Sequence, residues 1–313
     1  MSAVDVATFG ETMAALRADG PIRLGGTMRL SIAGAESNVA IGLARLGHRV
    51  RWVGLVGGDE TGELVLRTLR AEGVDIGHAR VDERGPTGLI LFERRLGDVV
   101  RVSYHRAGSA ASFLSADDVR PALEPPPRLL HVTGITPALG PGPASAVRAA
   151  AQSGVRVCLD VNYRGRLWDR DRAAAALRPL VPSLSVVVAS DDELALVAPP
   201  SATTERDRVA ALLDAGVAEV VIKRGAAGAS GHTLHSHVDV PARRVRVVDV
   251  VGAGDAFVAG YLSGLLDHLD LTGRLDRAVS TGAFAVASPG DWEGLPTRAD
   301  LELLDAQPGS TLR

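Results

Sequence analysis

The sequence predicts an α/β protein whose central sheet is mostly parallel and covered by helices on both faces. Short runs of β-branched and other apolar residues recur along the chain, and longer segments with helical spacing lie between them. Continuous apolar runs of this kind are typical of parallel strands that are buried on both sides. Two segments interrupt the alternation and indicate a smaller second sheet.

The alternation can be followed from the N-terminus. We expect strands at the short apolar runs 4–9, 50–56, 129–133, 155–161, 186–189 and 220–223. We expect helices at the intervening segments 35–46, 62–72, 144–153, 173–180, 192–197 and 205–215. The proline-rich stretches 125–127 and 137–143 are expected to be loops. Ligands of such sheets bind beyond the carboxyl ends of the strands, so we expect the functional site there.

The second sheet is expected from segments 11–32 and 87–105. Both alternate polar and apolar residues and lack helical periodicity. We expect them to form a small, discontinuous β lid over the strand ends, leaving residues 1–10, 33–86 and 106–313 as the main α/β domain. A lid of this kind excludes water from a reaction. Its edge strands also predict pairing with another subunit.

Composition excludes several classes of function. The net charge is −3, and the 33 arginines are balanced by acidic residues, so we expect no nucleic-acid partner. No apolar run approaches the roughly 20 residues that span a bilayer, and the N-terminus lacks a secretory signal pattern. We therefore expect a cytoplasmic protein without a membrane partner. With one cysteine, the chain has no intrachain disulfide.

The most specific local feature is the Gly-Ala-Gly-Asp stretch 252–255. Gly252, Ala253 and Gly254 leave successive backbone amides uncovered, and the apolar run that follows has helical spacing. These amides therefore lie at a helix N-terminus, where an anion or a developing negative charge is stabilised. Asp255 in the first turn can act as a general base for a hydroxyl that attacks phosphorus. The alternative is a tight turn with Asp255 as a helix cap.

Two motifs together carry a family resemblance. Segment 249–257, Asp-Val-Val-Gly-Ala-Gly-Asp-Ala-Phe, resembles the C-terminal signature of the ribokinase-like (PfkB) carbohydrate kinases, and segment 34–59 resembles their N-terminal signature. The resemblance extends over essentially the whole chain. It implies a three-layer α/β/α fold with a β lid, an ATP- and Mg²⁺-dependent sugar kinase, and Asp255 as its base. Dimers are common in that family, so we expect a homodimer through the lid.

Within this family, segments 104–111, 133–139 and 160–168 are similar to the 2-keto-3-deoxygluconate kinases. This similarity implies a sugar-acid substrate. Arginine offers a planar fork that matches a carboxylate, which a neutral hexose does not require. Tyr104, Arg106 and Arg164 are the substrate-binding residues that the resemblance implies, with surface-exposed arginines as the alternative.

Other positions bear on the same substrate. Gly34 and Asn38 begin the first helix, where the resemblance implies contacts to the sugar and simple helix capping is the alternative. Ile90 and His105 stand where aromatic residues are frequent in the 2-keto-3-deoxygluconate kinases. A neutral sugar such as fructose or ribose therefore remains the alternative acceptor.

The nucleotide is expected beside the strand at 220–223 and the glycine-spaced loop after it. Such a loop can direct amides toward phosphates, and the chain has no Walker P-loop. The resemblance places segment 281–288 by the adenine, although that segment equally fits a core helix. The residues that the resemblance assigns to ATP are Asn162, Arg164, Lys223, Gly225, Gly228, Gly252 and Gly254.

Two metal positions follow from the resemblance. The family's Asn-x-x-Glu motif is matched by residues 190–193, where Glu193 is present and Ser190 replaces asparagine. Glu193 is thus expected to organise Mg²⁺ through water. Asp249 and Val251 resemble a monovalent-cation loop, which implies K⁺, and Val250 replaces its usual threonine.

Two further classes of protein are alternatives to a kinase. A sugar- or nucleotide-binding regulator without catalysis would explain the departures at Ser190 and Val250, but the intact Gly-Ala-Gly-Asp stretch argues against it. A dinucleotide-dependent oxidoreductase would need Gly-x-Gly-x-x-Gly after the first strand. The chain has Gly-Glu-Thr-Met at 10–13 instead.

Overall fold

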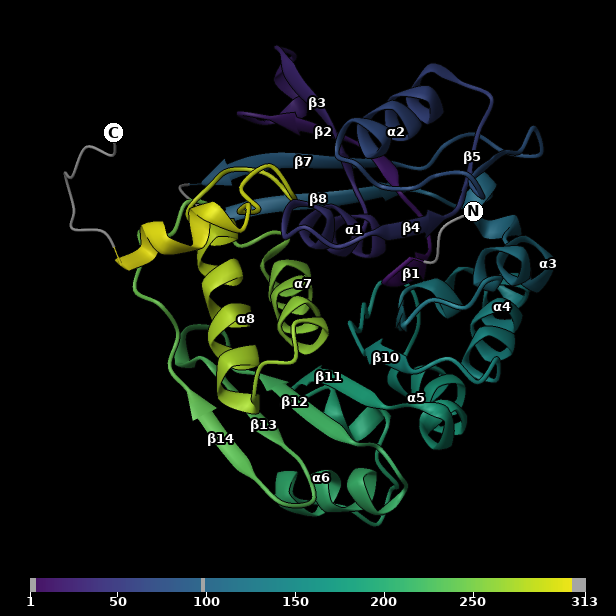
Figure 1. The fold of residues 1–313 in the computed structure, drawn as a ribbon. Helices are drawn as coiled ribbons and strands as arrows, with labels where there is room; N and C mark the ends of the chain where they lie inside the picture. Colours follow the sequence, from purple (N-terminus) through teal and green to yellow (C-terminus); the bar gives the residue numbers. More distant parts are fainter. Residues whose placement is uncertain (1–3, 97–98, 306–313) are drawn as a thin grey trace.

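The fold is described by a computed structural model for residues 4–96 and 99–305 (Figure 1). Its main body is an eight-stranded sheet with the order β14-β13-β12-β11-β10-β9-β1-β4. Neighbouring strands from β12 to β4 are parallel. These strands are β4 (Val50–Val53), β1 (Val6–Phe9), β9 (Leu129–Thr133), β10 (Val157–Asp160), β11 (Val186–Ser190) and β12 (Glu219–Lys223). The predicted fold class is confirmed.

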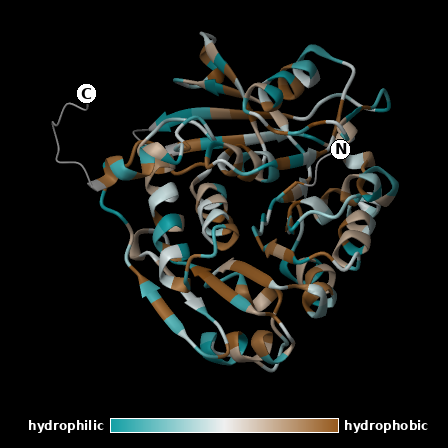
Figure 2. Ribbon diagram, in the orientation of Figure 1, coloured by the Kyte–Doolittle hydropathy of each residue, from teal (hydrophilic) through white to brown (hydrophobic). Residues whose placement is uncertain are grey.

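Helices cover both faces of this sheet. Val6 packs into one hydrophobic cluster and its neighbour Ala7 into the other, because successive strand residues point to opposite faces. Figure 2 shows the strands of the large sheet as mostly hydrophobic. The first cluster contains residues of α1 (Ala35–Arg45), α2 (Glu60–Ala71), α7 (Ala253–Leu266) and α8 (Leu271–Val286). The second contains residues of α3 (Ala116–Val119), α4 (Pro141–Ala151), α5 (Arg170–Leu177) and α6 (Glu205–Asp214).

None of the helices in the described ranges is long and apolar enough to cross a membrane. Short 3₁₀ helices join the larger elements. They are η1 (Ile22–Leu24), η2 (Ala110–Phe113), η3 (Arg120–Leu123), η4 (Thr136–Leu139), η5 (Arg178–Ser183), η6 (Leu194–Leu196), η7 (Gly225–Ala227) and η8 (Ala299–Asp305).

Several predicted segments differ from the structure. The expected loop 137–143 is largely η4 and the first turn of α4, because proline is well accommodated at the first position of a helix. The expected helix 192–197 is only the 3₁₀ turn η6. The expected strand 50–56 divides at Gly54 into β4 and β5 (Leu55–Val56), and β5 pairs with β6 (Arg80–Val81).

Two strands of the large sheet were not predicted. β13 (Ala229–His232) and β14 (His237–Val240) extend the sheet beyond β12 in antiparallel orientation. β13 contains Ser230 and Gly231 in place of a β-branched run. A Cβ at Gly231 would lie 2.9 Å from the Leu271 side chain, so close packing of α8 explains the glycine and weakens the strand pattern in the sequence.

A second sheet comes from the two segments predicted to form the lid. Its strands β2 (Met13–Ala18), β3 (Met28–Ala33), β7 (Leu89–Leu96) and β8 (Val99–His105) have the order β3-β2-β7-β8. Figure 1 shows this sheet at the top of the molecule, near α2. Its inner face includes Met13, Ala15 and Phe92 and packs against Val251 of the main body. Whether the sheet moves as a separate lid domain stays a prediction.

Candidate active site

The Gly-Ala-Gly-Asp stretch forms the N-terminus of helix α7. Gly252 has φ +75°, and a Cβ there would overlap the carbonyl oxygen of Asp291, so only glycine fits. The helix then runs from Ala253 to Leu266 and is buried from Asp255 onward because its residues are almost all apolar. The positive end of a buried helix therefore lies beside Asp255.

Two asparagines hold the carboxylate of Asp255. Asn38 Nδ2 donates to Oδ2 at 2.8 Å, and Asn162 Nδ2 lies 3.3 Å from Oδ1. Burial raises the pKa of Asp255 to about 6, while the Asn38 hydrogen bond and the Arg164 charge act in the lowering direction. A carboxyl group with this pKa is ionised near neutral pH and can still accept a proton readily, which suits a general base.

A second carboxylate, which the sequence reasoning did not assign, lies next to the first. Asp160 ends strand β10, and its oxygens accept from Asn162 at 3.1 Å and from Lys223 Nζ at 2.7 Å. A Cβ at Gly254 would lie 3.7 Å from Lys223 Nζ, so this ammonium group faces the start of α7. The position of Asp160 at the carboxyl end of a predicted strand was the available signal for it.

Lys223 carries its positive charge into a buried site. Burial acts to lower the pKa of Lys223, but the carboxylates of Asp160, Glu193 and Asp255 outweigh this effect and raise it. The ammonium group therefore stays charged at neutral pH. A fixed positive charge beside a helix N-terminus favours a bound anion.

Of the predicted substrate-binding residues, Tyr104 lies near the end of strand β8 and Arg106 directly follows that strand. The Arg106 guanidinium forms an ion pair with buried Glu11 and lies over the Tyr104 ring, 5.7 Å from its centroid. Ser109 Oγ also donates to Glu11, at 2.5 Å. Sequence reasoning missed Glu11, because nothing in the pattern shows a partner nearly a hundred residues away. Part of the Arg106 fork is thus already engaged inside the protein.

Buried polar atoms without a partner in the described residues gather around this region. They include Thr12 Oγ1, Asn38 Oδ1, Asn162 Oδ1 and Arg106 Nε. Buried polar groups are rarely left unpaired, so such atoms mark where a ligand or water binds. Gly34 is extended, with φ −178°, and a Cβ there would lie 2.5 Å from the Glu11 carbonyl oxygen. Backbone packing is therefore sufficient to explain this glycine.

Arg164 and Glu193 occupy the margin of the site. Arg164 is exposed and donates to the Tyr163 carbonyl at 3.2 Å. Both Glu193 oxygens accept backbone amides, from Tyr163 at 2.7 Å and Ser190 at 2.8 Å. Glu193 thus fixes the loop after β10 against the end of β11. Its predicted role toward Mg²⁺ stays a prediction, and no group of three or more His, Cys, Asp or Glu suited to a metal is found in the described chain.

The predicted nucleotide loop follows β12. Gly225 and Gly228 have φ +55° and +101°, and a Cβ at Gly228 would overlap the Val240 carbonyl oxygen. These glycines allow the turn between β12 and β13. Segment 281–288 begins within α8, where the Thr281 hydroxyl donates to carbonyl oxygens of its own helix. Residues 281–286 therefore belong to a helix, as the core-helix alternative expects. The contact of this segment with adenine stays a prediction.

The predicted cation loop contains a contact that sequence reasoning missed. Asp249 Oδ1 accepts the Val251 amide at 3.1 Å, and Oδ2 accepts from Arg17 Nη1 at 3.0 Å. Arg17 comes from the second sheet and also lies 3.3 Å from buried Asp291. Burial raises the pKa of Asp291 to about 7.

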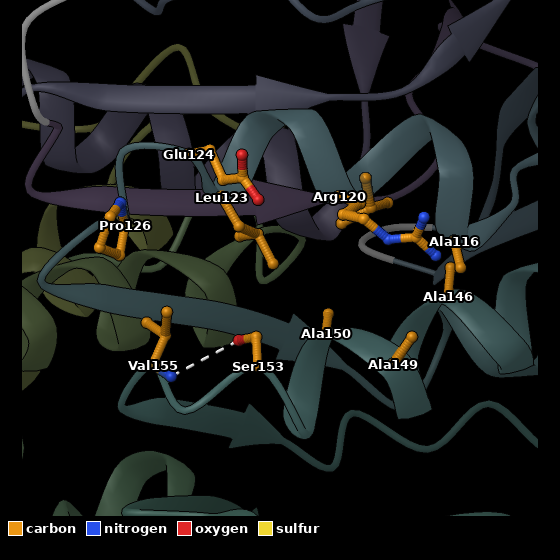
Figure 3. Close-up of a pocket in the computed structure, with 11 residues that line it drawn as sticks. Ala116, Arg120, Leu123, Glu124, Pro126, Ala146, Ala149, Ala150, Ser153 and Val155 are labelled. Carbon is orange, nitrogen blue, oxygen red and sulfur yellow. Dashed lines mark hydrogen bonds between the residues drawn. The ribbon is translucent and has the colours of Figure 1, made fainter.

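A separate cavity of about 430 Å³ lies between η3 and α4 (Figure 3). Its wall is mostly apolar, and its charged residues Arg120 and Glu124 are exposed. It shares no residue with the groups around Asp255, and we assign no function to it.

Comparison with known proteins identifies the family. Residues 4–298 match the pfkB family of carbohydrate kinases. The chain belongs to this family. It is 36% identical to a 2-dehydro-3-deoxygluconokinase of Bacillus subtilis (strain 168), over 97% of this chain and 96% of that protein. It is 34% identical to the 2-dehydro-3-deoxygluconokinase of Thermoproteus tenax, over 96% and 94% of the two chains.

The fold agrees with this assignment. A putative ribokinase II from E. coli, solved in complex with ATP and Mg²⁺, superimposes with a TM-score of 0.89 at 25% identity, covering 96% of this chain and 99% of that one. The ribokinase-like fold and the carbohydrate kinase activity expected from the sequence are therefore confirmed.

Proposed function

We propose that this carbohydrate kinase transfers the γ-phosphoryl group of ATP to a primary hydroxyl of a sugar acid, 2-keto-3-deoxygluconate (the compound also called 2-dehydro-3-deoxygluconate). The observation that carries the proposal is the buried Asp255 at the N-terminus of α7, which Asn38 and Asn162 hold. The Lys223 ammonium group lies close to Gly254 in the same turn. The kinases of Bacillus subtilis and Thermoproteus tenax that carry this substrate in their names support the choice of acceptor.

In the proposed reaction the substrate hydroxyl lies against Asp255. The carboxylate takes the hydroxyl proton as the hydroxyl oxygen forms its bond to the γ-phosphorus, and the bond from that phosphorus to the β-phosphate oxygen breaks to release ADP. The amides at the start of α7 stabilise the negative charge on the transferring group. Lys223 adds a fixed positive charge, and Asp160 holds it in place.

Mg²⁺ neutralises charge on the ATP phosphates when it is bound. A single carboxylate such as Glu193 fits this role, because Mg²⁺ keeps several waters and commonly needs only one or two carboxylates besides the phosphates. Glu193 would act from the loop it organises, with its oxygens already bonded to backbone amides.

The acid end of the substrate is assigned to the β7–β8 side of the site. Arg106 is mostly buried and keeps its Nε without a partner among the described residues, although Glu11 engages another part of its guanidinium. Tyr104 lies beside it on the same hairpin. A carboxylate bound there would meet a planar donor group that is already oriented.

The test is ATP-dependent release of ADP with Mg²⁺ across a panel of acceptors. The panel contains 2-keto-3-deoxygluconate, 2-keto-3-deoxygalactonate, 2-ketogluconate, fructose and ribose. We expect the highest kcat/KM with the keto-deoxy acids. Preference for fructose or ribose would contradict the assignment of the acid end. The absence of turnover with every acceptor, together with measurable sugar binding, would favour a regulatory binding protein.

A further inference from the structure

Arg17 contacts the loop at Asp249, and what we infer from this contact rests on the proposed kinase function. The sequence predicted a monovalent cation beside Asp249 and Val251. In the structure the Asp249 carboxylate already has partners on both oxygens. Oδ1 accepts the Val251 amide at 3.1 Å, while Oδ2 accepts from Arg17 at 3.0 Å and lies 3.4 Å from the Gly290 amide.

Arg17 is built into this position. Its side chain is 13% exposed, and its Nη2 lies 3.3 Å from Asp291 Oδ2, so one guanidinium bridges two carboxylates. The Phe92 ring lies beneath it, with 3.9 Å between Cζ and the ring centroid. A planar fork that stacks on an aromatic ring, donates a hydrogen bond to one carboxylate and forms an ion pair with a second is a well-determined arrangement for arginine.

The two carboxylates flank the catalytic loop. Asp249 lies three residues before Gly252, and the carbonyl oxygen of Asp291 packs directly against Gly252. Without a positive charge, these carboxylates would repel the phosphoryl group that the loop amides are meant to stabilise. An ionised Asp291 would also be costly without a positive partner, because its side chain is buried. A positive charge at this point therefore favours the ionised carboxylates and reduces their repulsion of the phosphoryl group.

We propose that the Arg17 guanidinium supplies this charge, so that the kinase turns over without a bound monovalent cation. Arg17 then acts as a positioning residue, because it reaches the reacting atoms only through Asp249, Asp291 and the loop they flank. It also links strand β2 of the second sheet to the start of α7. Arg29, its cross-strand neighbour on β3, pairs at the surface with Asp19 instead and provides a matched control.

The test compares the full-length enzyme in chloride salts of K⁺, Na⁺ and tetramethylammonium at equal ionic strength, with its best acceptor and Mg²⁺-ATP. We expect wild-type turnover in the three salts to agree within about twofold, because only general screening remains. For Arg17→Met in tetramethylammonium, we expect turnover to fall by about tenfold or more, with partial recovery specific to K⁺. Arg29→Met should behave as the wild type.

A second measurement does not depend on turnover. The melting temperature of Arg17→Met should rise in K⁺ relative to tetramethylammonium, while that of the wild type should not change. Arg17→Lys keeps one positive charge and should remain indifferent to K⁺. This variant carries the comparison if Arg17→Met does not fold.

Three results would overturn the inference. They are a wild-type enzyme that K⁺ stimulates by about tenfold or more, an Arg17→Met enzyme that keeps full turnover, and an Arg17→Met enzyme whose loss K⁺ does not relieve. The last would mean a purely structural role. An enzyme inactive with every acceptor would instead refute the proposed kinase function, so the two failures are distinguishable.

Discussion

At the scale of single residues, Asp255 combines two properties that a general base needs. It lies at the helix end where the phosphoryl group is expected, and its pKa is raised to about 6 by burial. We expect Asp255→Asn to lower kcat by about a hundredfold or more, because the amide cannot accept the hydroxyl proton. The substrate dissociation constant should change little. Steady-state kinetics with calorimetric sugar binding would measure both quantities.

The stability of the same variant provides the control. A folded-state pKa of about 6 against an ordinary value of 3.8 means that ionised Asp255 costs the folded protein up to about 3 kcal/mol above pH 6. This cost falls as the pH drops through 6 and is absent below pH 3.8. Asp255→Asn should therefore melt higher than the wild type at pH 8, and the difference should shrink toward pH 4. Near-wild-type turnover in a folded Asp255→Asn protein would sink the assignment.

Residue-scale prediction was possible where the signal was local, although the roles it gives to the site residues stay predictions. The Gly-Ala-Gly-Asp stretch pointed to Asp255 as a candidate base because its residues are contiguous. Glu11, Asp160 and Arg17 were missed because each acquires its role from a partner distant in the sequence, as in the pairs Glu11–Arg106 and Arg17–Asp249. A single sequence shows the charge of such residues but not which other charge the fold brings to them.

At the scale of elements, the start of α7 makes different demands on its two glycines. Gly252 has φ +75° and no space for a Cβ, whereas Gly254 lies within the helix and its Cβ would meet only Lys223 Nζ, at 3.7 Å. We expect Gly252→Ala to lower the free energy of unfolding by about 1–3 kcal/mol. Gly254→Ala should leave stability unchanged or slightly higher, since alanine favours helix formation, yet it should reduce turnover by crowding the phosphoryl position.

Chemical denaturation and kcat measured on the two variants would separate these effects. Equal loss of stability in both would contradict the geometry assigned to the loop. Full activity in Gly254→Ala would show that the phosphoryl group does not approach this part of the helix.

The pattern of apolar residues predicted the helices and strands correctly wherever a whole face, or both faces, of the element is buried. The parallel strands β9, β11 and β12 and the helices α1 and α6 lie within a few residues of their predicted bounds. β13 escaped prediction because close packing of α8 selects small residues there. Prolines were misread between 137 and 143, because a proline at the first turn of a helix looks in the sequence like a loop signal.

At the scale of the whole molecule, the second sheet leaves an apolar surface on its outer side. Leu30 on strand β3 is 57% exposed, and Met28 on the same face is 39% exposed. β3 is also an edge of its sheet, so its backbone groups and these side chains are open to another chain. Paired exposed edges with apolar side chains are a self-complementary surface, which fits a two-fold dimer.

We therefore expect the wild-type protein to be a homodimer joined through this sheet, and Leu30→Arg to weaken the dimer by at least about tenfold, because a two-fold axis places the two introduced charges near each other. Size-exclusion chromatography with light scattering over a range of concentrations would measure the change. Leu234→Arg is the matched control, since Leu234 is 65% exposed in the turn between β13 and β14, on a different sheet. A wild-type protein that is monomeric at all concentrations would exclude the dimer. Equal dissociation of both variants would contradict an interface at β3. Either result would mean that the exposed Leu30 and Met28 do not serve subunit contact.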